Sequence, residues 1–182
     1  MAYLRQSKWT YDTSATLGFS LGFSVISGGM ISLNDPDRNP HHFHFGAFGA
    51  GISRGLALTR IEVPQTIVRN YDFSGSVALE DFKSGGVVFM TDAFQGRKLS
   101  LSDIQGVTAY IEGGVAAFSG FGGDVMFLGL DPIPFLTSIA FPGFSHLMTL
   151  AIDRAPAVLL MGGSIVGPQV ATGLRALIGQ LH

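Results

Sequence analysis

Three closely spaced histidines form the sharpest chemical cluster in the chain. His42 and His44 are two positions apart, so in a strand both side chains would point to the same face. Two imidazoles in this His-x-His geometry can bind a transition metal, and Asp35 and Asp37 lie just upstream as sources of oxygen ligands. The spacing makes His42 and His44 candidate metal ligands of a metal-dependent enzyme, which would need a third ligand from elsewhere in the chain.

The same cluster also fits the solvated start of a strand. His41 follows a loop rich in Pro, Asn and Asp, where histidines are tolerated, and no carboxylate follows in the strand. The other histidines, His146 and His182, are distant in sequence. A pH-sensitive interface belongs to this interpretation, because imidazoles that gain charge near about pH 6 repel one another. We favour the solvated strand and keep the metal site as the alternative.

Two segments match the Gly-x-Ser-x-Gly pattern of a nucleophile elbow, with Ser20 and Ser53 at their centres. That elbow is a sharp turn between a strand and a helix, whereas Ser20 lies in an unbroken alternating pattern and Ser53 precedes another strand-like run. The Gly-rich segments 46–51 and 162–167 lack the spacing or the Lys-Ser/Thr pair of phosphate-binding loops. The sequence therefore predicts no catalytic residue and no cofactor.

The composition leaves little polar surface. Hydrophobic residues make up 47% of the 182 residues and charged residues only 13%, with 25 glycines and a mean hydropathy of +0.38. This length suffices for a single domain, which we take to span 1–182. An isolated monomer of this composition could not cover itself with polar groups, so we expect a homo-oligomer, or burial against a lipid or membrane surface.

Charge, cysteines and the first residues exclude other classes. A net charge of -2, with lysines only at 8, 83 and 98, argues against nucleic acid as a partner, because phosphate binding needs a basic surface. The absence of cysteine removes disulfides and thiolate metal sites. The first residues contain no apolar segment typical of a Sec signal peptide. We expect a cytoplasmic or membrane-associated protein.

The segment 15–33 organises the predicted fold. Large apolar residues alternate with Gly and Ser at 17–25, which predicts a strand with one apolar face and one face of small residues. Such a small-residue face allows close packing by a second layer. Alternating or Gly-rich patterns at 41–52, 70–79 and 107–130, a short strand at 56–63 and a compact buried strand at 85–91 complete the prediction. Together they predict a Gly-rich antiparallel sandwich or barrel-like sheet over 10–131, with Gly28-Gly29 as a hairpin turn.

The last third of the chain changes character. Residues 132–152 and 155–174 carry no charge and flank Asp153-Arg154, which resembles a hydrophobic helical hairpin of membrane-spanning length. Pro and Gly within both segments favour short buried helices instead. We therefore predict a mainly β (α+β) fold in which an apolar helical part, 132–182, packs on the sheet.

These observations favour a non-enzymatic protein that works by presenting apolar surface. It would assemble with copies of itself or associate with a membrane, as a bacterial secretion-linked component whose export needs no signal peptide. Two alternatives belong to other classes: a module that binds lipid or a hydrophobic small molecule on its Phe-rich sheet, and the metal-dependent enzyme that uses His42 and His44.

Overall fold

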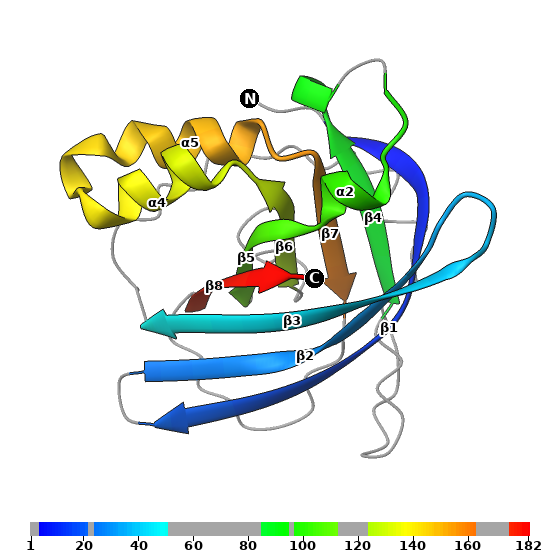
Figure 1. The fold of residues 1–182 in the computed structure, drawn as a ribbon, viewed down its shortest axis with the longest axis horizontal. Helices are drawn as coiled ribbons and strands as arrows, with labels where there is room; N and C mark the ends of the chain where they lie inside the picture. The colour runs from blue at the N-terminus through cyan, green and yellow to red at the C-terminus, as the bar shows by residue number, and fades with distance from the viewer. Residues whose placement is uncertain (1–3, 22–23, 51–84, 95–96, 113–123, 163–174) are drawn as a thin grey trace.

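The computed structural model describes residues 4–21, 24–50, 85–94, 97–112, 124–162 and 175–182, and the account below concerns these residues. Their strands close into an antiparallel barrel in the order β1-β2-β3-β8-β5-β6-β7-β4 (Figure 1). The mainly β, barrel-like fold predicted from the sequence is confirmed. The strands are β1 (Leu4–Leu21), β2 (Ser24–Asn34), β3 (Pro40–Ala50), β4 (Gly85–Thr91), β5 (Gly106–Glu112), β6 (Asp124–Leu130), β7 (Ala157–Gly162) and β8 (Arg175–Leu181).

The first three strands are the longest in the barrel. The alternating segment predicted as a strand lies in β1, which pairs with β2 from Thr10 opposite Asn34 to Leu21 opposite Ser24. β2 pairs with β3 along its whole length, from Ser24 opposite Ala50 to Asn34 opposite Pro40. The side chains of 13–29 lie outside the description, as do the strands predicted at 56–63 and 70–79, so the covering of the small-residue face stays a prediction.

The predicted turn at Gly28-Gly29 is wrong. Both glycines lie inside β2, where Gly28 is opposite Leu17 of β1 and Gly46 of β3. β1 ends at Leu21, and its partner Ser24 begins β2, so the strands reverse direction six residues earlier than predicted. Local turn preference is the weaker influence here, because the earlier turn lets β2 pair over its whole length with both neighbours.

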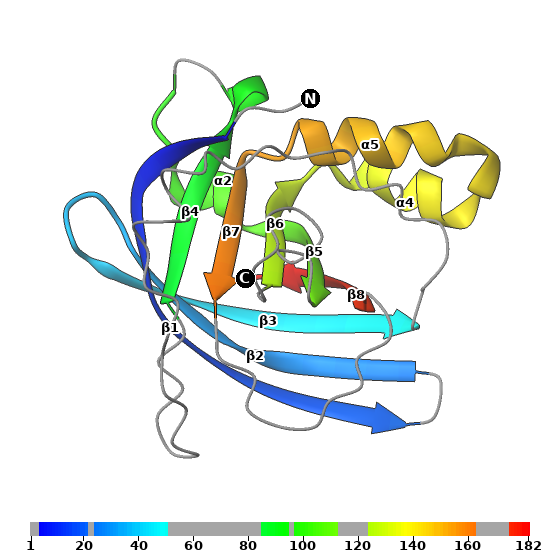
Figure 2. The same ribbon diagram turned by 180° about the vertical axis from the view of Figure 1, so that it is seen from behind.

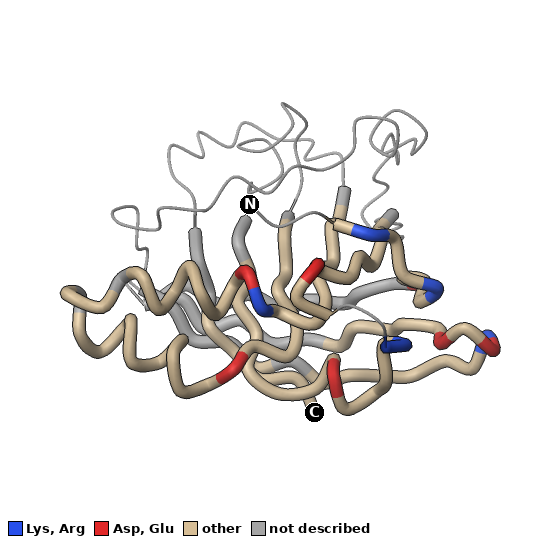
Figure 3. The backbone as a smooth tube through the Cα atoms, turned by 90° about the horizontal axis from the view of Figure 1, so that it is seen from above, with Lys and Arg blue, Asp and Glu red and all other residues tan. Residues whose placement is uncertain are grey.

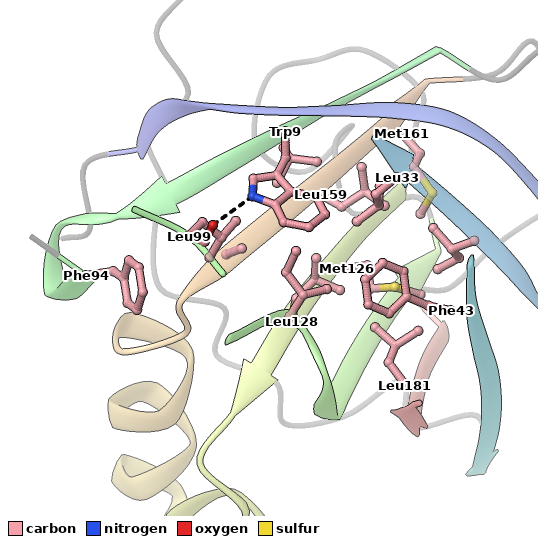
Figure 4. Packing of buried hydrophobic residues seen from close by; sticks show 14 residues of the cluster. Trp9, Leu33, Phe43, Phe94, Leu99, Met126, Leu128, Leu159, Met161 and Leu181 are labelled. Atoms are coloured by element: carbon pink, nitrogen blue, oxygen red, sulfur yellow. Dashed lines mark hydrogen bonds between the residues drawn. The ribbon is translucent and has the colours of Figure 1, made fainter. Parts of the chain in front are cut away.

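The barrel interior is filled by side chains from strands on all sides. Trp9 of β1 is 5% exposed, and its indole Nε1 donates a hydrogen bond of 2.9 Å to the carbonyl oxygen of Leu99 (Figure 4). Phe43 of β3, Met126 of β6 and Leu181 of β8 pack in the same cluster. Residues far apart in the sequence thus share one core. Their packing holds the strands in the observed order.

A second apolar cluster lies on the outer side of part of the barrel wall. Val125 and Phe127 of β6 and Val158 of β7 belong to it, while their neighbours Met126 and Leu159 belong to the interior cluster. These strands are therefore buried on both faces. This explains their continuous apolar sequences, since a strand with one solvated face would alternate.

The helical tail predicted for 132–182 is right only in its first part. Two helices, α4 (Pro132–Ala140) and α5 (Ser145–Asp153), are joined through the 3-10 turn η2 (Pro142–Phe144). At 157–162 and 175–181 the prediction is wrong, because β7 and β8 are strands of the barrel itself, while 163–174 lie outside the described residues. The uncharged run that suggested a helix contains β7, a strand that faces apolar side chains on both sides.

Short helical elements also follow β4. The 3-10 turn η1 (Asp92–Phe94) continues directly from that strand, and α2 (Leu101–Ile104) is a single helical turn. Ser100 precedes α2, and its backbone N–H donates to Asp103 at 2.9 Å. Ile104 of α2 is fully buried in the interior cluster, so this turn closes one end of the barrel.

Candidate functional site

The three histidines at the start of β3 do not share one environment. His42 and His44 are exposed, and Phe43 between them is 1% exposed and faces the interior. The two candidate ligands therefore lie on the same face of the strand, as the two-residue spacing predicted, and the structure shows that this is the outer face of the barrel. His41 is half-buried, and its Nε2 lies 3.1 Å from Oδ2 of Asp35.

Asp35 and Asp37, the predicted oxygen donors, belong to the turn between β2 and β3. Oδ1 of Asp35 accepts hydrogen bonds from the backbone N–H groups of Asp37 and Asn39 at 2.9 and 2.8 Å. The Asn39 side chain donates to Asp35 as well, at 3.0 Å to Oδ2. This carboxylate is thus used to hold a tight turn.

His182 is the residue that the sequence did not connect with this cluster. Its backbone forms two hydrogen bonds with His44, N–H of His44 to O of His182 at 2.9 Å and the reverse at 3.1 Å. Their rings are 5.9 Å apart between centroids. Across the described ranges, no group of three or more His, Cys, Asp or Glu side chains is arranged to hold a metal ion. The assignment of His42 and His44 as ligands stays a prediction.

The helices α4 and α5, with η2 between them, form the most unusual surface of the described structure. We call residues 132–153 the helical hairpin. Figures 1 and 2 show its two helices side by side, with the connection between them pointing away from β4 and β7. At its base, Asp131 caps α4 by accepting a hydrogen bond of 3.0 Å from the backbone N–H of Ile133.

One side of the helical hairpin packs on the barrel. Phe135 of α4 is 2% exposed, and Ile152 of α5 is 4% exposed, and both join the outer apolar cluster with Phe127 of β6. Ser138 is buried beside them, and its hydroxyl donates to the carbonyl oxygen of Phe135 at 2.6 Å. This side confirms the expected packing of short helices on the sheet.

The opposite side is apolar too, yet it faces outward. Ile133 is 76% exposed and Phe141 is 59% exposed, values normally found for polar residues. Of the large apolar side chains that are exposed in the described ranges, all but Leu101 lie in the helical hairpin: Ile133, Leu136, Ile139, Phe141, Phe144 and Leu150. Exposed large apolar side chains that gather in one element in this way mark a site that contacts another protein or a membrane.

Aromatic rings gather where the two helices join. The ring of Phe144 lies 6.4 Å from that of Phe141, edge to face, and 6.1 Å from the His146 ring. No Asp, Glu, Lys or Arg occurs from 132 to 152, and in Figure 3 the hairpin is tan along both helices until the end of α5. The apolar tip therefore carries no charged group that would need water.

Sequence reasoning missed the exposure of this tip, although a signal was present. A nine-residue helix that lies on a sheet buries only one stripe of side chains, and its other stripe is normally polar. The segment 132–152 lacks charge on every stripe, so part of its apolar surface had to remain uncovered by the sheet. Within the described ranges, no helix has both the length and the apolar character needed to cross a bilayer.

The fold and this site together define a β-barrel protein that presents an apolar helical hairpin. No family model matches the chain, and no solved structure matches it significantly. The chain is 32% identical, over 186 aligned positions, to the toxin protein Tse4 of Pseudomonas aeruginosa, covering 98% of this chain and 95% of that protein. The chain belongs to the family of this bacterial toxin.

Proposed function

We propose that the chain is a toxin that binds lipid membranes through the outward side of its helical hairpin, without catalysing a reaction. The observation that carries the proposal is the exposed, uncharged tip formed by Phe141 and Phe144, together with Ile133 of the same hairpin. The toxin relative supports the secretion-linked role expected from the composition.

A bilayer fits this surface better than a second copy of the chain does. Protein interfaces surround an apolar centre with a polar rim that supplies hydrogen bonds. The helical hairpin has no charged side chain between its base residues Asp131 and Asp153, and its tip projects from the barrel. Amphipathic helices that bind membranes place such apolar side chains at the boundary between headgroups and acyl chains.

The charge of the chain points to binding driven by apolar contact. A net charge of -2 gives the protein no general attraction to anionic lipids. The free energy of binding must then come from burying the exposed side chains of the tip, at about 25 cal/mol for each Å² of apolar surface. Uncharged phosphatidylcholine vesicles are therefore a suitable target.

The test is flotation of the full chain with phosphatidylcholine vesicles. We expect the double variant Phe141→Ser, Phe144→Ser to bind at least about tenfold more weakly, because two rings no longer enter the bilayer. Leu101→Ser is the matched control, since Leu101 is 38% exposed but lies in α2, outside the hairpin. This control should float like the unchanged chain.

Light scattering of the same samples distinguishes binding of the tip to lipid from binding of the tip to a second copy of the chain. An unchanged chain that ignores vesicles but forms oligomers that the double variant does not form would overturn the proposal and assign the tip to a second copy. Equal flotation of the double variant and the unchanged chain would also contradict it, because the tip would then contribute nothing to lipid binding.

A further inference from the structure

A single ionisable side chain lies at the tip of the helical hairpin. His146 is the second residue of α5, is exposed, and has its ring 6.1 Å from the ring of Phe144. A histidine changes charge between about pH 5 and pH 8, whereas the apolar side chains around it do not. Any pH dependence of the tip itself must therefore come from this residue.

The charged groups near His146 can be named element by element. Neither α4 nor η2 contains an ionisable residue. In α5 the other ionisable residue is Asp153, which is the last residue of the helix, at the opposite end from His146 and next to Arg154 in the chain. β6, which α5 contacts, carries Asp124 at its start, at the end of the strand away from α4. Within the described residues, no carboxylate is placed to compensate a proton on His146.

We propose that His146 makes membrane binding pH-dependent, with the neutral imidazole as the form that docks. This inference rests on the proposed function. A charged imidazole carried to an apolar boundary loses hydration that no carboxylate of the described residues replaces, so docking favours the neutral form. The start of α5 adds to this effect, because the positive end of a helix dipole disfavours a cation there.

The sign of the effect follows from this preference. The membrane-bound state disfavours the protonated imidazole. The affinity for the membrane is therefore highest where the imidazole is neutral, and it declines as falling pH protonates it. The affinity for an uncharged bilayer should then fall about tenfold between about pH 7.5 and about pH 5.5.

The experiment compares three full-length proteins on phosphatidylcholine vesicles at these two pH values. We expect the unchanged chain to lose about tenfold in affinity at the lower pH and the His146→Gln variant to bind equally at both. His42→Gln is the matched control, because His42 is an exposed histidine on the barrel wall, and it should keep the full pH dependence. Circular dichroism at both pH values shows whether each protein stays folded.

Two outcomes would overturn the inference, and they are distinguishable. If His146→Gln loses affinity in parallel with the unchanged chain, His146 is not the responsive group, although docking through the hairpin stands. If the unchanged chain floats at neither pH, the proposed function itself fails.

Discussion

At the scale of single residues, Asp35 shows how one carboxylate can hold a turn. It accepts hydrogen bonds from the side chain and backbone of Asn39 and from the backbone of Asp37, and it lies beside His41. The Asn39 side chain is the main cause that lowers the pKa of Asp35 from 3.8 to about 2, with the backbone N–H of Asn39 next. These donors favour the charged form.

The lowered pKa of Asp35 predicts how stability depends on acid. Because the carboxylate is favoured in the folded state, its contribution is complete above about pH 4 and is lost as the pH falls through about 2. We expect the free energy of unfolding of Asp35→Asn to change less over this window than that of the unchanged chain. Urea unfolding at several pH values, followed by Trp9 fluorescence, measures this. Parallel curves for the two proteins would contradict the prediction.

The histidines show what residue spacing can predict. The shared face of His42 and His44 followed from the two-residue period of a strand, because that period requires no knowledge of the rest of the fold. The position of His182 beside His44 did not follow, since it depends on the pairing of β3 with β8. Local geometry is readable from sequence, whereas contacts across the barrel are not.

At the scale of elements, Gly129 sets how closely α2 approaches β6. Its φ of 67° is in the left-handed region, where a side chain is strained. A Cβ at this position would also collide with the carbonyl oxygen of Asp103 in α2 and would lie 3.3 Å from the ring of Pro156. Only glycine fits both the backbone angle and this contact.

We therefore expect Gly129→Ala to destabilise the protein by about 2 kcal/mol or more, from backbone strain and displacement of α2. Gly46→Ala is the matched control, because Gly46 lies in β3 with open space around its Cα. That variant should be as stable as the unchanged chain or slightly more so. Urea unfolding checks both, and equal stability of the two variants would show that the contact with α2 is unimportant.

The strands β1 and β3 were predicted and β7 was missed, because their sequence patterns differ. β1 and β3 carry the two-residue alternation that distinguishes a strand from a helix. β7 has buried side chains on both faces, so its sequence, Ala-Val-Leu-Leu-Met-Gly, shows no period. β4 is also continuous and apolar, but glycines and a short length marked it as a strand. β7 lies within a long uncharged segment, so its sequence showed no comparable mark of a short strand.

At the scale of the whole molecule, β7 and β8 are essential to the barrel. β7 joins β4 to β6, and β8 joins β3 to β5. Side chains of both strands, among them Leu159 and Leu181, pack in the interior cluster with Trp9. The barrel-like sheet was predictable from composition and alternation, but this strand order was not, because apolar residues pair with many partners equally well.

A chain that ends at Asp131 should therefore not fold. It would lack both joining strands, and its apolar wall would be open to water. We expect Trp9 fluorescence typical of a solvated indole and no cooperative unfolding transition, measured beside the full chain. A cooperative transition with buried Trp9 emission in the shortened chain would show that β7 and β8 are dispensable.

The pairing of β3 with β8 has a consequence for synthesis. Phe45 of β3 pairs with Leu181 of β8, so the ribosome must release nearly all of this sequence before β3 meets its second neighbour. Until then one edge of β3 in the nascent polypeptide is unpaired, and such intermediates are prone to aggregate. A cell that makes this protein must shelter it during translation, and a chaperone that recognises apolar strands is the type of helper suited to the task.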